Sequence, residues 1–132
     1  MNKLKSYPAI ERIWNEGGDE FEIYYSKPSF FNDAIMGHDF VCKVHEHLTN
    51  DINKHIEYNY LKIGDIKAKL EPAAIFDLLQ KAHWNPKGEA NSLLANLGIT
   101  RSSMTVGDII KHKTSNQLYI VEPFGFKLVH LK

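Results

Sequence analysis

Arg101-Ser-Ser-Met-Thr-Val-Gly-Asp-Ile-Ile110 is the stretch that decides the fold of this 132-residue chain. Gly107 can adopt the positive φ that a tight turn requires, and the side chain of Asp108 can hydrogen-bond the backbone of the same turn. β-Branched residues, which favour extended strands, flank the turn on both sides: Val106, Ile109 and Ile110. The segment therefore predicts a tight turn that leads into a strand.

Two further strands follow. Apolar residues at about 108–112, 117–122 and 125–131 are separated by turn residues at 114–116 and 123–125. Pro123 stops the second strand, because proline has no N–H to donate to a β-ladder. The C-terminal part of the chain is therefore predicted to form a three-stranded β-meander.

The upstream pattern supplies helices and two more strands. Apolar spacing predicts helices at 7–15, 38–55, 71–83 and 89–97, and strands at 19–25 and 57–70. The helix at 38–55 is predicted from apolar residues at positions 40, 44, 48 and 52, which would form a stripe along one helix face. The β-branched residues at 40–44 are also compatible with a strand there. Gly64 interrupts the strand at 57–70, which indicates either a bulge or a hairpin turn.

Together these elements predict an α+β fold. We expect a small mixed or antiparallel sheet with a C-terminal β-meander, and helices packed mainly on one face. Hydrophobic residues make up 43% of the chain, which suffices for one core in a single domain of residues 1–132. No apolar run approaches the ~20 residues that a membrane-spanning helix requires, so no membrane partner is expected.

Cysteine content and the N-terminal segment bear on the compartment. Cys42 is the only cysteine, so a disulfide within the chain is excluded. The two lysines near the N-terminus are not followed by the apolar region of a secretory signal. Both observations favour a cytoplasmic location.

The charge is balanced overall and uneven along the chain. Residues 1–60 contain 6 Lys/Arg and 10 Asp/Glu, a net charge of −4, whereas residues 61–132 contain 10 and 6, a net charge of +4. A basic surface in the second half would be compatible with nucleic acid. Lysine outnumbers arginine by 14 to 2, however, and arginine is the better reader of base edges and phosphates.

Ser103-Met-Thr-Val-Gly-Asp108, with the hairpin after it and Gly125-Phe126, resembles the end of YodL-like domains. These small domains recur in bacterial mobile elements and phages, and their Ser-Met-Ser-Val-x-Asp signature differs here by threonine at 105. Leu70-Glu71 and Phe76 are similar to the preceding helix of the family. The resemblance covers about residues 57–130. It implies a phage or mobile-element context and assigns no catalytic residue.

Two features depart from the family pattern. Residues 1–56 have no counterpart and read as a helix–strand–helix extension, and the usual Asp-Gly hairpin tip is replaced by Thr114-Ser-Asn116.

Several potential metal ligands lie within ten residues: His38, Asp39, Cys42, His45 and His47. On a helix, spacings of four and three would bring His38, Cys42 and His45 together, where they could bind a metal ion or activate the thiol. A fourth ligand at standard spacing, a second cysteine and an oxyanion site are not readable here. We therefore favour a polar helix face with a packed cysteine, and expect no cofactor, no metal site and no catalytic residue. A small Cys/His-dependent or metal-dependent enzyme stays an alternative.

The turn itself supplies candidate binding residues. Arg101, Ser103, Thr105 and Asp108 surround backbone amides that could form a small anion nest. No glycine-rich phosphate loop with its lysine follows. The simpler interpretation is that the hydroxyls bond the backbone of the turn and that Asp108 fixes its shape.

Aromatic rings could stack bases if they stood on an open sheet face beside lysines. The aromatic candidates are Trp14, Trp84, Tyr24, Tyr25, Tyr58, Tyr60 and Tyr119, and the lysines are Lys62, Lys67, Lys69, Lys111, Lys113 and Lys127. The alternative is that the rings fill the core and the lysines keep strand edges soluble. Nucleic acid is therefore the second choice of partner.

Residues 29–36 form the other candidate binding segment. They are predicted to be a loop, yet they include four large apolar side chains: Phe30, Phe31, Ile35 and Met36. Loops are normally polar, because their backbone must meet water. We interpret the segment either as a lid on the core or as an exposed patch for a partner.

Together the observations favour a protein partner. We expect a non-enzymatic accessory protein of a phage or mobile element that binds a host or element protein, with a role in defence or replication.

Overall fold

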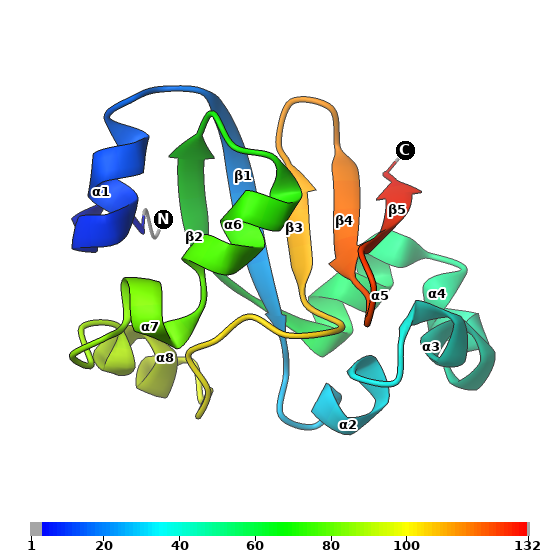
Figure 1. Ribbon diagram of the computed structural model, residues 1–132. Coiled ribbons are helices and arrows are strands. Elements are labelled where there is room, and N and C mark those ends of the chain that lie inside the picture. Colours follow the sequence, from blue (N-terminus) through cyan, green and yellow to red (C-terminus); the bar gives the residue numbers. More distant parts are fainter. Residues whose placement is uncertain (1–3, 132) are drawn as a thin grey trace.

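The computed structural model describes residues 4–131. Its centre is an antiparallel five-stranded sheet with the strand order β2-β1-β3-β4-β5 (Figure 1). The strands are β1 (Asp19–Ser26), β2 (Tyr60–Ala68), β3 (Ile109–His112), β4 (Gln117–Val121) and β5 (Phe126–His130). The predicted α+β class and the C-terminal β-meander are confirmed.

Strand β1 joins the two parts of the chain in one sheet. It pairs with β2 on one side and with β3 on the other. Residues 1–56, expected as an extension, therefore contribute a strand from inside the sheet. Between β1 and β2, Ile23 faces Gly64 and Tyr24 faces Lys62, so the strand bulges at this point. The bulge alternative for Gly64 is confirmed and the hairpin-turn alternative is wrong.

Eight α-helices and one 3-10 helix lie within residues 4–131. They are η1 (Leu4–Ser6), α1 (Pro8–Trp14), α2 (Phe31–Ala34), α3 (His38–Val44), α4 (Glu46–Thr49), α5 (Ile52–Asn59), α6 (Pro72–Leu78), α7 (Lys81–Trp84) and α8 (Asn91–Asn96). Among these described helices, none has the length and apolar character of a membrane span.

The helices cover both faces of the sheet, which corrects the expectation that they pack mainly on one. Figure 1 shows α6 in front of the strands and α5 behind them. Neighbouring residues of β3 illustrate the division, because side chains of a strand alternate between faces. Ile110 packs in a core with residues of α1, α6, α7 and α8, whereas Ile109 packs in a second core with residues of α2, α3 and α5.

Three predicted segments differ in detail. The single helix at 38–55 is wrong: the chain forms α3, α4 and α5 there, and the backbone breaks at His45 with φ −115° and ψ 36°. The helix at 71–83 is divided into α6 and α7, since Leu79 and Gln80 leave helical geometry. The segment 29–37, predicted as a loop, contains the short helix α2.

Candidate functional site

The stretch 101–108 is held by a buried ion pair between Arg101 and Asp108. The carboxylate of Asp108 is 0% exposed. Both guanidinium nitrogens bond it, with Nη2 lying 2.7 Å from Oδ1 and Nη1 bonding Oδ2. The backbone N–H groups of Ser26 and Thr105 donate to the same carboxylate, each at 2.9 Å. The ion pair therefore joins the end of β1 to the turn that begins the meander.

These contacts identify the anion that the turn holds. Four donors converge on the two oxygens of Asp108, which requires the ionised, acceptor-only carboxylate. Burial raises the pKa of Asp108, and the guanidinium of Arg101 with the two backbone N–H groups opposes that rise. The anion nest suggested by the sequence is thus filled by the chain's own aspartate, in agreement with its predicted role in fixing the turn.

Arg101 also packs between two aromatic rings. Its guanidinium carbon lies 4.5 Å from the ring centre of Tyr25 and 5.0 Å from that of Phe31. Nη2 additionally donates to the hydroxyl of Ser26 at 3.1 Å, and Nη1 donates to the carbonyl of Ser103 at 3.2 Å. Two recesses of about 770 and 320 Å³ reach Arg101. The engaged guanidinium offers them little free hydrogen-bonding capacity.

Side chains from other elements fix the rest of the stretch. The hydroxyl of Tyr25 and the indole N–H of Trp84 both donate to the carbonyl of Ser102, at 2.8 and 2.9 Å. Ser103 accepts from the backbone N–H of Lys81 at the start of α7, a helix whose own N-cap makes no side-chain bond. Four of the candidate binding residues named from the sequence (Arg101, Ser103, Thr105 and Asp108) therefore lie together, and their contacts within the chain are structural.

The histidine–cysteine cluster does not converge on one point. Cys42 Sγ lies 3.3 Å from Nε2 of His38, whereas Nε2 of His45 faces the carboxylate of Asp33 at 2.8 Å. Across residues 4–131, no three His, Cys, Asp or Glu side chains come close enough to hold a metal ion. His45 still follows α3 with its N–H on the carbonyl of Val41, but its ring is turned to Asp33 of α2 and not to Cys42.

His55 is a buried polar residue that the sequence pattern did not indicate. It is 1% exposed and packs edge-on against Phe30 and Tyr60, with ring centres 5.3 and 5.5 Å away. Its Nδ1 bonds the side-chain amide of Asn59 at 3.0 Å, but no group among residues 4–131 bonds its Nε2. Burial, with smaller contributions from two neighbouring histidines, lowers the pKa of His55 to about 4.

We expect acid to destabilise the fold through His55. The unfolded chain binds a proton at this residue near its ordinary pKa of 6.5, whereas the folded chain does so only near 4. Stability is therefore lost as the pH falls from 6.5 to 4, by up to about 3 kcal/mol. Urea unfolding at several pH values should show this loss in the wild type and in the exposed-residue control His47→Phe. It should be much smaller in His55→Phe, and an equal loss in all three proteins would contradict the assignment.

A network of partly buried charged residues joins β1, β2 and β3. Lys62 Nζ lies 3.1 Å from Glu22 and 3.0 Å from Asp65, and Lys111 lies 3.4 Å from Glu22. Burial acts to raise the pKa of Glu22, but the Tyr24 hydroxyl and the two lysines outweigh it and hold that pKa below its ordinary value. The network therefore stabilises the charged form of Glu22, which already exists at neutral pH.

The apolar segment 29–36 divides between core and surface. Phe30 is buried in the second core, and Phe31 packs on Arg101. Ile35 and Met36 are exposed, Met36 by 60%. The lid interpretation therefore describes Phe30, while the surface interpretation describes Met36.

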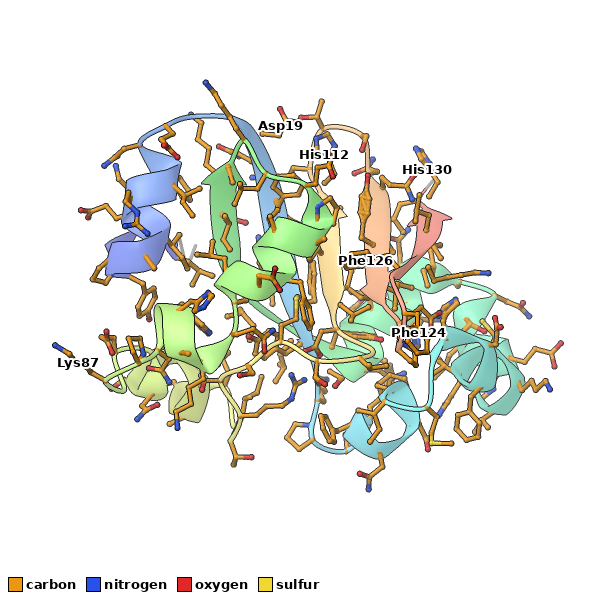
Figure 2. All side chains as sticks on the ribbon, in the orientation of Figure 1. Asp19, Lys87, His112, Phe124, Phe126 and His130 are labelled. Atoms are coloured by element: carbon orange, nitrogen blue, oxygen red, sulfur yellow. The ribbon has the colours of Figure 1, made fainter. Side chains whose placement is uncertain are left out.

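Phe124 adds an exposed ring beside this segment. It lies at the tip of the β4–β5 hairpin and is 97% exposed. The carboxylate of Glu122, two residues earlier, reaches the backbone N–H of His38 at 3.5 Å. Met36 and Phe124 each lie within two residues of this contact, and Figure 2 shows Phe124 between β5 and the α2–α3 region. We refer to Ile35, Met36 and Phe124 as the apolar tip.

The sequence contains a signal for the exposure of Phe124. The ring stands between Pro123 and Gly125, and this Pro-Phe-Gly connection predicts a turn. A side chain at the tip of a hairpin has no sheet neighbours to bury it, so an aromatic residue there indicates an exposed ring.

Comparison of the chain with protein-family models, curated proteins and solved structures found no match. The YodL-like resemblance therefore stays a prediction.

Proposed function

We propose that this chain is a non-enzymatic accessory protein of a phage or bacterial mobile element, and that it acts by binding another protein through the apolar tip. The exposed ring of Phe124 carries this proposal. A phenylalanine that is 97% exposed and a methionine that is 60% exposed supply apolar area that folding leaves in water. Burying each side chain against a partner would contribute about 1.5–3 kcal/mol to binding.

The composition of the apolar tip suits a protein interface. Aromatic residues and methionine are enriched in interface cores relative to the remaining surface, and methionine adapts its shape to the partner. Charged groups lie close by, since Glu122 touches the α2–α3 junction and Asp33 pairs with His45. An apolar centre with polar residues around it is the usual arrangement of a site of this kind.

Nucleic acid ranks second because its expected contacts are engaged elsewhere. Three of the lysines named for phosphate binding are paired with carboxylates of β1: Lys62 and Lys111 with Glu22, and Lys113 with Glu20. Among the rings, Tyr25, Tyr60 and Trp84 are buried. These pairings reduce the free positive charge that releases counterions on binding to a phosphate backbone.

An enzyme ranks third. Cys42 and His38 form a contact, but five recesses of the described chain are lined by other residues. A nucleophile also needs an oriented base and a substrate recess within reach.

The double variant Phe124→Ser, Met36→Ser tests the proposal. Both side chains are exposed, so the melting temperature should stay within a few degrees of the wild type, while partner binding is lost. Tagged wild-type protein would be used to isolate the partner from bacterial lysate in the presence of nuclease. The purified partner would then be titrated against the wild type, the double variant and the control Tyr58→Ser, an exposed aromatic residue of α5.

Two results would contradict this proposal. Unchanged affinity of the double variant for the purified partner would exclude the apolar tip as the site. Complexes that disappear with nuclease and weaken steeply with salt would favour the nucleic-acid alternative.

A further inference from the structure

Strand β5 forms an unpaired end of the sheet. The opposite end, at β2, is flanked by α1, whereas within residues 4–131 no strand pairs with the outer side of β5 (Figure 1). Edge strands expose backbone N–H and C=O groups that can pair with another chain. Leu128, in the middle of β5, is 60% exposed.

The hydrogen bonds of the β4–β5 hairpin determine which groups of β5 point outward. Glu122 N–H donates to the carbonyl of Gly125, and Leu131 N–H donates to the carbonyl of Asn116. Bonded and non-bonded pairs alternate along an antiparallel ladder, so Lys127 and Val129 also face β4 with their backbone groups. The backbone groups of Phe126, Leu128 and His130 therefore point away from the sheet.

We infer that β5 is a self-association edge, where two copies of this chain pair antiparallel about a twofold axis at Leu128. In this register Leu128 faces Leu128 of the second copy, and Phe126 faces His130. Each of these pairs joins residues whose backbone groups point outward, which allows about six hydrogen bonds between the chains. The two sheets would then continue as one across an isologous interface.

The side chains favour this register over the two registers whose twofold axis lies one residue away, at Lys127 or at Val129. Lys127 lies opposite Val129 of the second copy, so the lysines do not face each other. A register centred on Lys127 would place like charges directly opposite, which is destabilising. A register centred on Val129 would place Phe126 opposite a position beyond the end of β5 in the second copy, so Phe126 would have no cross-strand partner within that strand. On the other face, Leu128 and Phe126 continue the apolar surface that begins at Tyr119, whose ring contacts Phe126 edge-on.

Charge variants at Leu128 test the inference independently of the apolar tip. The wild type should form a concentration-dependent dimer in sedimentation equilibrium, and Leu128→Lys and Leu128→Glu should each be monomeric. Mixing the two variants should restore a dimer, because opposite charges then face each other across the axis. Leu128→Pro should also be monomeric, since it removes an outward N–H and keeps the bonds to β4.

The controls separate this interface from others. Tyr58→Lys, at another exposed site, should leave the dimer unchanged. At a protein concentration at which the wild type is also monomeric, Leu128→Lys should melt cooperatively at the wild-type temperature, which would show that the variant is folded. A wild type that stays monomeric up to its solubility limit would overturn the inference, and so would a dimer that persists in both charge variants or variants that do not associate when mixed.

Discussion

Replacing Arg101 with alanine is expected to lower the free energy of unfolding by about 3–5 kcal/mol, because it leaves a fully buried carboxylate without its counter-ion. Asp108 is 0% exposed and accepts two hydrogen bonds from Arg101. The two backbone donors that remain, from Ser26 and Thr105, cannot neutralise its charge. Urea unfolding at neutral pH, compared between wild type and variant, measures this loss directly.

The chain offers a matched control for this substitution. Arg12 is the other arginine, and its side chain is exposed on α1, so Arg12→Ala should change stability by less than about 0.5 kcal/mol. Arg101→Lys should lie between the two, since lysine keeps the charge but cannot bond both carboxylate oxygens in the same planar geometry. Equal stabilities of the two alanine variants would show that the ion pair does not hold the turn.

The fold of the C-terminal part could be predicted because its signals are local. The turns of this part depend on Gly107, Asp108 and the turn residues of the meander, each of which determines the conformation of only the few residues next to it. The structure confirms each of these turns. The bond from the backbone N–H of Ser26 to Asp108 could not be predicted in the same way. Ser26 is 82 residues away and is brought to the turn by the pairing of β1 with β3.

The helical region at 38–55 shows why a periodic pattern can mislead. The stripe at 40, 44, 48 and 52 has helical spacing, yet Val44 is half exposed, and the buried residues are His38, Val41, His55 and Ile56. Short helices joined at His45 and Asn50 bury a different set of side chains than one straight helix would. Tertiary packing against the second core outweighs the local pattern here.

The candidate sites were only partly visible for a related reason. Composition identified residues 29–36 as too apolar for a free loop, but it could not assign each side chain to core or surface. Phe30 is buried between histidine and tyrosine rings, and Met36, six residues later, is exposed. Which of these side chains is buried depends on the direction of α2 relative to β1. The sequence of residues 29–36 carries no information about that direction.

Replacing Gly107 with valine is expected to lower the free energy of unfolding by roughly 2–6 kcal/mol, from two separate causes. The residue has φ +92°, a conformation that side-chain-bearing residues rarely adopt. A Cβ atom there would also lie 2.6 Å from the Cβ of Ala34 and 2.7 Å from its carbonyl oxygen. The turn and α2 would have to separate, although the hydroxyl of Tyr60 donates to the carbonyl of Gly107 at 2.8 Å and restrains the turn.

Alanine variants separate the two causes. Gly98 has φ +75° and no atom within 4 Å of an added Cβ, so Gly98→Ala reports the backbone cost alone. Gly107→Ala should be less stable than Gly98→Ala by about 1–3 kcal/mol, which is the cost of the contact with Ala34. Adding Ala34→Gly to Gly107→Ala should recover part of that difference, because it removes the closest atom. Equal losses in Gly98→Ala and Gly107→Ala would mean that α2 moves freely, and that the turn is not packed against it.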